Sequence, residues 1–172
     1  MEAPQDPAGV FVPEDRIDSG RRAELIAEVE AAPSALSDAV AGLRDDQLDT
    51  KYRNWTIRQI VHHLADSHLN ASARFRWALT EDRPTIKPYE ESRWAELEDA
   101  RSGDIRASLA ILDGLHARWA RLLRSMTEEQ FARSFFHPEM DQTVDLGQAL
   151  SQYAWHGRHH TAQILWVREH RG

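Results

Sequence analysis

The chain contains no cysteine among its 172 residues. This absence excludes disulfide bonds, thiolate metal ligands and a cysteine nucleophile. Metal binding or acid–base chemistry in this protein must therefore come from imidazole and carboxylate groups.

Strongly basic segments and long apolar segments are also missing. The 28 acidic residues outnumber the 21 basic ones, and the net charge of −7 disfavours nucleic acids and anionic membranes as partners. No apolar run approaches the roughly 18 residues of a membrane span, and no basic-then-apolar leader opens the chain. We therefore expect a soluble, cytoplasmic protein with one globular domain that buries roughly 70% of its unfolded surface.

Histidine and tryptophan are frequent instead, with nine and six residues. His156 and His160 are four residues apart, which is one helical turn, so both imidazoles point the same way. A second cluster, His62, His63 and His68, lies far upstream in another helical pattern. Two imidazoles from one helix and one from another can occupy three corners of a tetrahedral metal site. The fourth corner would stay open, as in catalytic sites.

Hydrophobic periodicity predicts four long helices, at about residues 19–43, 56–80, 103–125 and 145–170. Asp18 or Ser19, Thr56 and Asp145 are the expected N-caps, and Pro33 predicts a kink or two abutting helices in the first segment. The first 18 residues, with three prolines, should form an irregular arm before a single domain over residues 19–172. This pattern predicts an all-α four-helix bundle, with any site built between facing helices.

The connections between these helices differ in length. Residues 44–54 are predicted to be a polar connection, and residues 81–102 a long loop that could serve as a lid or a crossover. Residues 127–130 resemble the start of a short helical turn. Residues 132–144 are predicted to be a loop with a little extended structure.

The periodicity also indicates which histidines face the core. At 100° per residue, His160 and His156 lie close to the apolar stripe of the last helix, whereas His159 points toward solvent or a partner. On the second helix His68 lies nearest the apolar face, His63 at its edge, and His62 away from it. His68 and His116 could each be core imidazoles or outer partners that orient a ligand. The third ligand is therefore open on periodicity alone.

Several separated motifs resemble those of the DinB-like proteins, specifically the YfiT-type metal-dependent hydrolases. They agree in order and spacing from roughly residue 10 to the end of the chain: Asn54–His68, Leu79–Asp82, Pro84–Glu91, Arg93–Leu97, His116–Trp119 and Trp155–His160. The resemblance implies a four-helix bundle that binds one divalent metal ion through three histidines. Carried over to this chain, the ligands are His63, His156 and His160. Here the resemblance overrules the preference for His68.

Such a site could perform more than one reaction. Three neutral imidazoles leave a metal ion its full charge, which lowers the pKa of bound water and supports hydrolysis of a small molecule. The glutamate that serves as general base in helical zinc proteases is missing. Asp66 is one candidate for an outer partner or a base. Glu81, Glu90 or Glu91 could also reach the site if the long loop folds over it.

Two other functions stay open. A metal ion can deprotonate a coordinated thiol without a protein base, and some relatives use low-molecular-weight thiols such as bacillithiol or mycothiol. In such a transferase Arg58, Arg74 or Arg158 could hold carboxylates of the thiol, although arginines on helix surfaces are usually solvated. The third possibility is a non-catalytic metal-binding stress protein. The expected metal is Zn²⁺, with Ni²⁺ or Fe²⁺ as alternatives, since imidazole ligands suit all three.

Trp155 and Trp166 are predicted to point away from the core stripe of the last helix. Two large rings on one outer face indicate a partner surface, unless the N-terminal arm or the long loop covers them. Together with the resemblance, this pattern predicts a homodimer.

Overall fold

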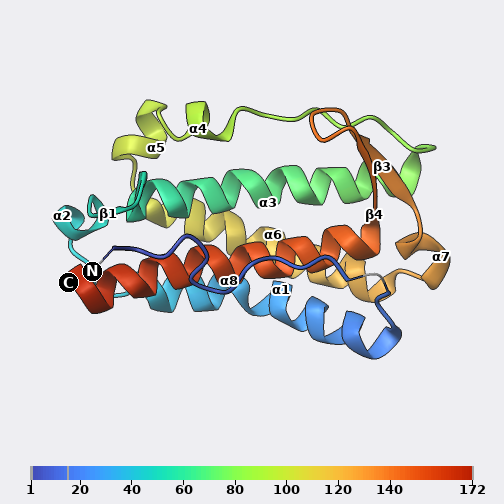
Figure 1. Ribbon diagram of the computed structural model, residues 1–172, viewed down its shortest axis with the longest axis horizontal. Coiled ribbons are helices and arrows are strands. Elements are labelled where there is room, and N and C mark those ends of the chain that lie inside the picture. The colour runs from blue at the N-terminus through green and yellow to red at the C-terminus, as the bar shows by residue number, and fades with distance from the viewer. Residues whose placement is uncertain (1, 15, 172) are drawn as a thin grey trace.

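The computed structural model describes residues 2–14 and 16–171, and it is a four-helix bundle (Figure 1). The long helices are α1 (Ser19–Val40), α3 (Ile57–Thr80), α6 (Ile105–Ser125) and α8 (Leu146–Arg171). Helix α1 packs against α6 and α8, and α3 packs against the same two helices. Helices α1 and α3 therefore occupy opposite corners of the bundle. Of the four packed pairs, α3 and α8 make the least extensive contact.

The N-termini of the long helices confirm the predicted caps. Asp18 accepts a hydrogen bond from the backbone of Arg21, and Thr56 and Gln59 form a reciprocal capping box at the start of α3. Asp145 accepts from the backbone of Gln148 in the first turn of α8. Helix α1 ends at Val40 rather than near Leu43, because Gly42 adopts a left-handed conformation with φ of 73°.

The predicted loops contain short elements that periodicity could not detect, because each is too short to show a repeat. Residues 44–54 include α2 (Asp45–Leu48) and strand β1 (Lys51–Tyr52), which pairs with β2 (Trp55–Thr56). Residues 81–102 include α4 (Glu91–Trp94) and α5 (Glu98–Ser102). The predicted turn after Thr127 is α7 (Glu128–Phe131). The extended structure within residues 132–144 is the hairpin of β3 (Ser134–His137) and β4 (Gln142–Asp145).

The hairpin and the long crossing between α3 and α6 are joined to each other. The backbone N–H of Ile86 donates to the carbonyl of Phe136 at 3.0 Å, and the N–H of Phe136 donates to the carbonyl of Pro84 at 2.9 Å. Beyond this contact the crossing runs along α3, where it carries α4 and α5 (Figure 1). This contact fixes the start of the segment that contains Tyr89, Glu90 and Glu91.

The hydrophobic core divides into two clusters along the bundle. One includes Phe75, Trp119 and Leu150, and the other includes Ile60, Leu112 and Ile164. On α3, α6 and α8 the residues between the two clusters include buried histidines. The polar layer therefore lies about halfway along the bundle, enclosed by apolar packing on both sides.

The outer face of α8 differs from the prediction. The arm runs along α8 (Figure 1), where Phe11 packs against Trp155 and the indole N–H of Trp155 donates to the carbonyl of Gly9 at 2.9 Å. His159, predicted to face solvent or a partner, is buried and stacked on the same indole. Trp166 packs edge-on against Tyr52. The alternative in which the arm covers this face is therefore correct for Trp155.

No helix in the described part of the chain is long and apolar enough to cross a membrane.

Candidate metal centre

Three histidines from α3 and α8 converge where these two helices face each other. One ring nitrogen from each of His63, His156 and His160 lies within 4.8 Å of the other two. The Nε2 atoms of His63 and His156 are 3.3 Å apart, a distance that a shared proton or a metal ion can bridge. These are the three residues that the family resemblance selects. The arrangement supplies three imidazole donors from two helices.

The surrounding protein keeps these imidazoles neutral. Burial lowers the pKa of His63 to about 4, and it also lowers the pKa values of His156 and His160 well below 6.5. A neutral imidazole has a free lone pair, which is the form that coordinates a metal ion. At neutral pH all three rings are therefore in the protonation state that ligation requires.

His68, which periodicity favoured as a ligand, uses both ring nitrogens within the protein. Its Nδ1 lies 2.7 Å from Nε2 of His116, and its Nε2 lies 3.2 Å from Nδ1 of His156. Nδ1 of His116 in turn lies 2.5 Å from the carbonyl oxygen of Val29. His68 and His116 therefore connect His156 to α1.

The carbonyl of Val29 sets the direction of this hydrogen-bond chain. A carbonyl only accepts, so Nδ1 of His116 carries the proton and its Nε2 accepts from Nδ1 of His68. Nε2 of His68 then accepts from Nδ1 of His156. The remaining nitrogen of His156, Nε2, keeps its lone pair and faces His63. The chain thus fixes both the tautomer and the orientation of His156.

Pro33 explains why the Val29 carbonyl is available for this contact. In a regular helix that carbonyl would accept from the backbone N–H four residues later, and proline has none. The helix continues through Pro33 as a single element, and His116 supplies the missing donor. Pro33 was predicted to cause a kink or to separate two abutting helices. It instead lies within one helix and frees the Val29 carbonyl, where the chain that orients His156 starts.

Two further residues shape the site, and periodicity did not identify either. Gln163, one turn beyond His160, accepts from Nδ1 of that ring at 2.8 Å, which leaves the lone pair on Nε2 of His160. Trp55, from strand β2, packs on His63 and His160 with ring centroids 4.6 and 6.3 Å away. The spacing of Gln163 from His160 could have indicated the first contact. The contact of Trp55 with the two histidines becomes evident only from the position of the β1–β2 hairpin.

Gly157 lets α1 and α8 approach closely beside the histidines. A Cβ atom at this position would lie 3.3 Å from Cβ of Ala32 and 3.8 Å from Cε1 of His68. A larger residue would push α1 away from α8 at the level of the hydrogen-bond chain.

His62 differs from its neighbour His63. It was predicted to point away from the core, but it is buried against α6, where Ser108 Oγ lies 2.8 Å from Nδ1 and the carbonyl of Gly103 lies 3.3 Å from Nε2. Both ring nitrogens are therefore paired. The loop that ends at Gly103 covers the face of α3 that periodicity predicts to be exposed.

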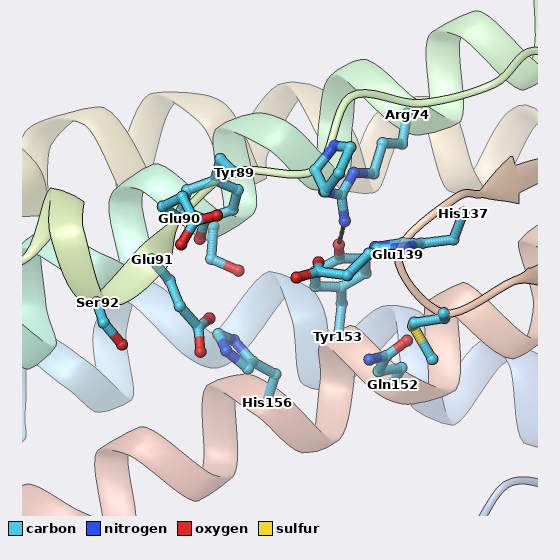
Figure 2. Close-up of a pocket in the computed structure, with 13 residues that line it drawn as sticks. Arg74, Tyr89, Glu90, Glu91, Ser92, His137, Glu139, Gln152, Tyr153 and His156 are labelled. Atoms are coloured by element: carbon cyan, nitrogen blue, oxygen red, sulfur yellow. Dashed lines mark hydrogen bonds between the residues drawn. The ribbon is translucent and has the colours of Figure 1, made fainter.

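Two cavities reach the histidines from different sides. One has a volume of about 430 Å³ and is lined by residues that include Ser67, Arg74, Tyr89, Tyr153 and His156 (Figure 2). The other, of about 530 Å³, is lined by residues that include Tyr52, Trp55, His160 and Gln163. Glu91 lines both cavities. Small molecules can thus approach His156 through the first cavity and His160 through the second, whereas His63 lines neither.

Among the carboxylates named from the sequence, Glu91 is the best placed. Its side chain points toward His156 in Figure 2, and although Glu91 is exposed, desolvation by its surroundings together with Glu139 raises its pKa. Glu90 lines only the first cavity, and Glu81 follows α3 on the surface. Asp66 is half-buried, and burial together with Asp99 raises its pKa to about 6, but it lines neither cavity.

The three arginines considered as anion-binding residues have different surroundings. Arg158 is exposed and pairs with Glu28, whereas Arg58 and Arg74 are buried. The expectation that such arginines are solvated is therefore wrong for two of the three. Arg74 lines the cavity beside His156.

The fold and the site together define the class of protein: an all-α four-helix bundle with three histidines that converge between two of its helices. The DinB superfamily matches residues 28–164, and this chain belongs to that family. It is 46% identical over 160 residues to a Bacillus subtilis protein named "Putative metal-dependent hydrolase YfiT", covering 92% of this chain and 90% of the relative. It is 52% identical over 151 residues to a "Putative metal-dependent hydrolase" of Geobacillus thermodenitrificans, covering 87% and 85%.

Solved structures agree with this assignment. The Bacillus subtilis YfiT structure, a four-helix bundle, superposes with a TM-score of 0.92 at 44% identity and covers 95% of both chains. A mycothiol-dependent maleylpyruvate isomerase superposes with a TM-score of 0.62 at 17% identity, covering 80% of this chain and 60% of its own. The second likeness shows that the fold is shared.

Proposed function

We propose that this protein is a divalent-metal-dependent enzyme that acts on small molecules, with hydrolysis as its reaction. His63, His156 and His160 would hold the metal ion. The single observation that carries the proposal is the convergence of these three imidazoles beside two open cavities. The names of the relatives as metal-dependent hydrolases support it.

The donor set fits a transition-metal ion. Three neutral nitrogen donors suit Zn²⁺, and also Ni²⁺ or Fe²⁺, and three protein ligands are typical of catalytic rather than structural zinc sites. When bound, such an ion lowers the pKa of a coordinated water or thiol toward neutrality. Zn²⁺ is the metal we propose.

The residues around the histidines would perform the remaining tasks. His68 and Gln163 orient His156 and His160 through their Nδ1 atoms. Trp55 packs on two of the three rings and limits their rotation. Glu91, with its raised pKa, would accept a proton from the attacking water and return it to the leaving group.

Metal content tests the first part of this proposal. We expect about one metal ion per chain by mass spectrometry on untagged protein. The ion should be lost in His63→Ala and His156→Ala and kept in His68→Ala. Retention without His63 combined with loss without His68 would show that His68 is the ligand. No metal in the wild type, even after supplementation, would refute the metal centre.

The reaction requires a separate assay. Turnover of esters or amides without an added thiol would support hydrolysis. Activity that strictly requires a low-molecular-weight thiol and consumes an electrophile would replace hydrolysis with thiol transfer. A folded, metal-loaded protein without either activity would favour a non-catalytic metal-binding stress protein, although the open cavities favour an enzyme.

We also propose a homodimer and a cytoplasmic location. Trp155 gives less support for the homodimer than expected, because the arm covers it. The exposed side chains of Val10, Val12 and Leu165 offer apolar surface near the same helix. Gel filtration with light scattering at micromolar concentration and cell fractionation test the two proposals.

A further inference from the structure

Three arginines of the described chain are buried, and they differ in how their charge is balanced. Arg22 pairs with Glu128, and Arg58 pairs with both Asp45 and Asp49. Arg74 is only 8% exposed, yet no carboxylate of the described residues lies within 4.0 Å of its nitrogens. A buried charge without a counter-ion is costly, so proteins rarely keep one unless a ligand supplies the partner.

The hydrogen bonds of Arg74 leave most of its donors free. Among the described residues, its one side-chain hydrogen bond runs from Nη1 to the hydroxyl of Tyr153 at 2.9 Å (Figure 2). Its Nε is buried without a partner. Five N–H donors on a planar group match a carboxylate better than a single phenol does.

The same cavity contains other unsatisfied polar groups. The hydroxyl of Tyr89 and Nδ1 of His137 are buried and have no partner among the described residues, and both residues line the cavity with Arg74. Three residues that line one cavity of about 430 Å³ therefore have a polar atom without a partner, and each of these atoms is covered by the residues around it. This volume falls within the range of small-molecule sites.

The position of Arg74 relative to the histidines limits the size of the ligand. Tyr153 precedes His156 by three residues on α8, so the two lie about one helical turn, or about 5 Å, apart along the axis. Their ring centroids are 6.2 Å apart. A carboxylate at Arg74 and Tyr153 would thus place an atom a few bonds away next to His156.

We propose that Arg74 and Tyr153 bind the carboxylate of the substrate, which is a small ester or amide with a free carboxylate a few bonds from the reacting carbonyl. This inference rests on the proposed hydrolase for the position of the reacting bond. The binding of the carboxylate itself needs only the cavity and the unpaired guanidinium.

Binding of two matched probes tests the inference. N-acetylglycine carries the carboxylate, and N-acetylglycinamide replaces it with a neutral group of similar size. We expect N-acetylglycine to bind the wild type in calorimetry and to shift the guanidinium Nε–H resonance of Arg74, with the amide binding at least tenfold more weakly. The resonance is assigned as the one missing in Arg74→Met. Equal binding of the two probes would overturn the proposal.

Variants separate Arg74 from its surroundings. Arg74→Met should weaken N-acetylglycine binding at least tenfold, with a smaller loss in Tyr153→Phe and in Arg74→Lys. Arg76→Met is the matched control, because Arg76 lies on the same helix, makes no ion pair with the described residues and does not line the cavity. It should bind like the wild type. Unchanged binding in Arg74→Met, or an equal loss in Arg76→Met, would refute the proposal.

Two further variants test the remaining alternatives for what binds Arg74 and the probe. Glu139 also lines the cavity and could swing toward Arg74. If Glu139→Gln binds N-acetylglycine and the wild type does not, Glu139 is the partner and the proposal is wrong. His63→Ala, shown by mass spectrometry to lack metal, should still bind N-acetylglycine. Loss of metal with retained probe binding separates the two proposals, whereas loss of probe binding in His63→Ala would place the probe on the metal.

Discussion

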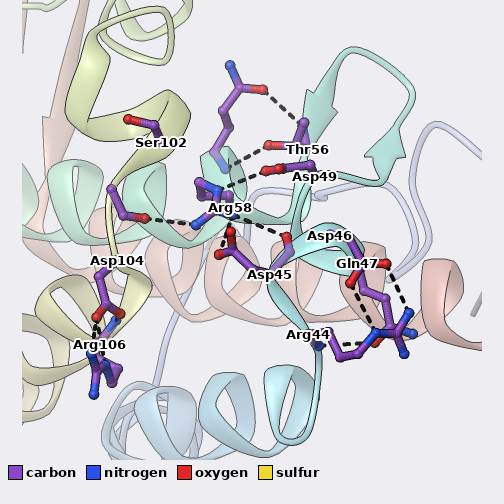
Figure 3. Close-up of polar contacts among 12 residues, drawn as sticks. Arg44, Asp45, Asp46, Gln47, Asp49, Thr56, Arg58, Ser102, Asp104 and Arg106 are labelled. Atoms are coloured by element: carbon purple, nitrogen blue, oxygen red, sulfur yellow. Dashed lines mark hydrogen bonds and ion pairs between the residues drawn. The ribbon is translucent and has the colours of Figure 1, made fainter.

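Two pairs of buried polar residues on α3 have opposite environments. At the start of the helix Arg58 donates to Asp49 and Asp45 at 2.8 Å each and to the carbonyl of Gly103 at 3.0 Å (Figure 3). Beside it His62 has both ring nitrogens paired. Farther along the helix, His63 faces two other imidazoles and Arg74 lacks a carboxylate. We call Arg58 and His62 the closed group, and His63 and Arg74 the open group.

The difference between the two groups distinguishes residues that stabilise the fold from residues that are available to bind a ligand. In the closed group the chain supplies every partner, so these contacts join α2, α3 and the loop before α6. In the open group the described residues give Arg74 no carboxylate partner and bring His63 against two other imidazoles, and Arg74 lines the cavity beside His156. Unsatisfied buried polar groups cost free energy of folding. Binding of an external ligand to these groups explains why the protein retains them. Substitutions in the two groups should therefore affect different measurements.

The largest expected effect contrasts His63 with His62. His63→Ala should weaken metal binding at least about a hundredfold, because three or four ligands share a total binding free energy of about 10–16 kcal/mol. His62→Ala should leave the affinity within about threefold, since its ring nitrogens bond only to the protein. Competition with a chromophoric chelator measures both constants. An equal loss of metal affinity in the two variants would contradict the distinction between His63 in the open group and His62 in the closed group.

The open group should also make stability depend on pH. Burial lowers the pKa of His63 to about 4 in the folded chain, against about 6.5 when unfolded, so the unfolded state binds more protons between these values. The free energy of unfolding of the metal-free protein should therefore fall as the pH drops from 6.5 to 4, by roughly 3 kcal/mol from this residue. Urea unfolding at several pH values measures the slope, which should be shallower in His63→Ala. Parallel curves would contradict the assignment.

Substitutions of the two arginines should differ in the size of their effect on stability. Arg58→Met removes four hydrogen bonds, to Asp45, Asp49 and Gly103, although the acidic partners are largely exposed, so we expect a loss of about 2 kcal/mol. Arg74→Met removes an unpaired buried charge and should change stability by less than about 1 kcal/mol, or increase it. Thermal unfolding in chelator should show a lower Tm, by about 4–8 °C, for Arg58→Met alone. A larger loss in Arg74→Met would mean that Arg74 is structural.

The smallest expected effect concerns the chain of histidines behind the metal centre. His116→Phe keeps the ring volume but removes the acceptor for His68, so metal affinity should fall about tenfold. His116→Gln, which can donate to Val29 and accept from His68, should restore part of it. The ¹⁵N shifts of His156 should report a mixture of tautomers only in the phenylalanine variant. Unchanged shifts would show that His116 only fills space.

Much of the bundle follows from local rules that act within a few residues. The apolar stripes and the caps Asp18, Thr56 and Asp145 predict where the long helices begin, because hydrogen bonding at a helix start depends on neighbouring residues. The helices α2, α4 and α5 and the β1–β2 hairpin were missed, since two to five residues carry no measurable period, whereas α7 and extended structure before α8 were predicted. Their role in the site, such as placing Trp55 on His63, depends on contacts between distant segments.

The sequence by itself determined the pairing of His156 with His160, because a four-residue spacing on a helix puts both side chains on one face whatever the helix packs against. It also determined the absence of thiolate ligands. Periodicity alone favoured His68 over His63, and the family resemblance selected His63. Only the tertiary structure shows why an edge position can face this pair, because its placement depends on how α3 and α8 approach each other. It alone left Arg74 without a counter-ion and covered Trp155, since both depend on chain segments far away in the sequence.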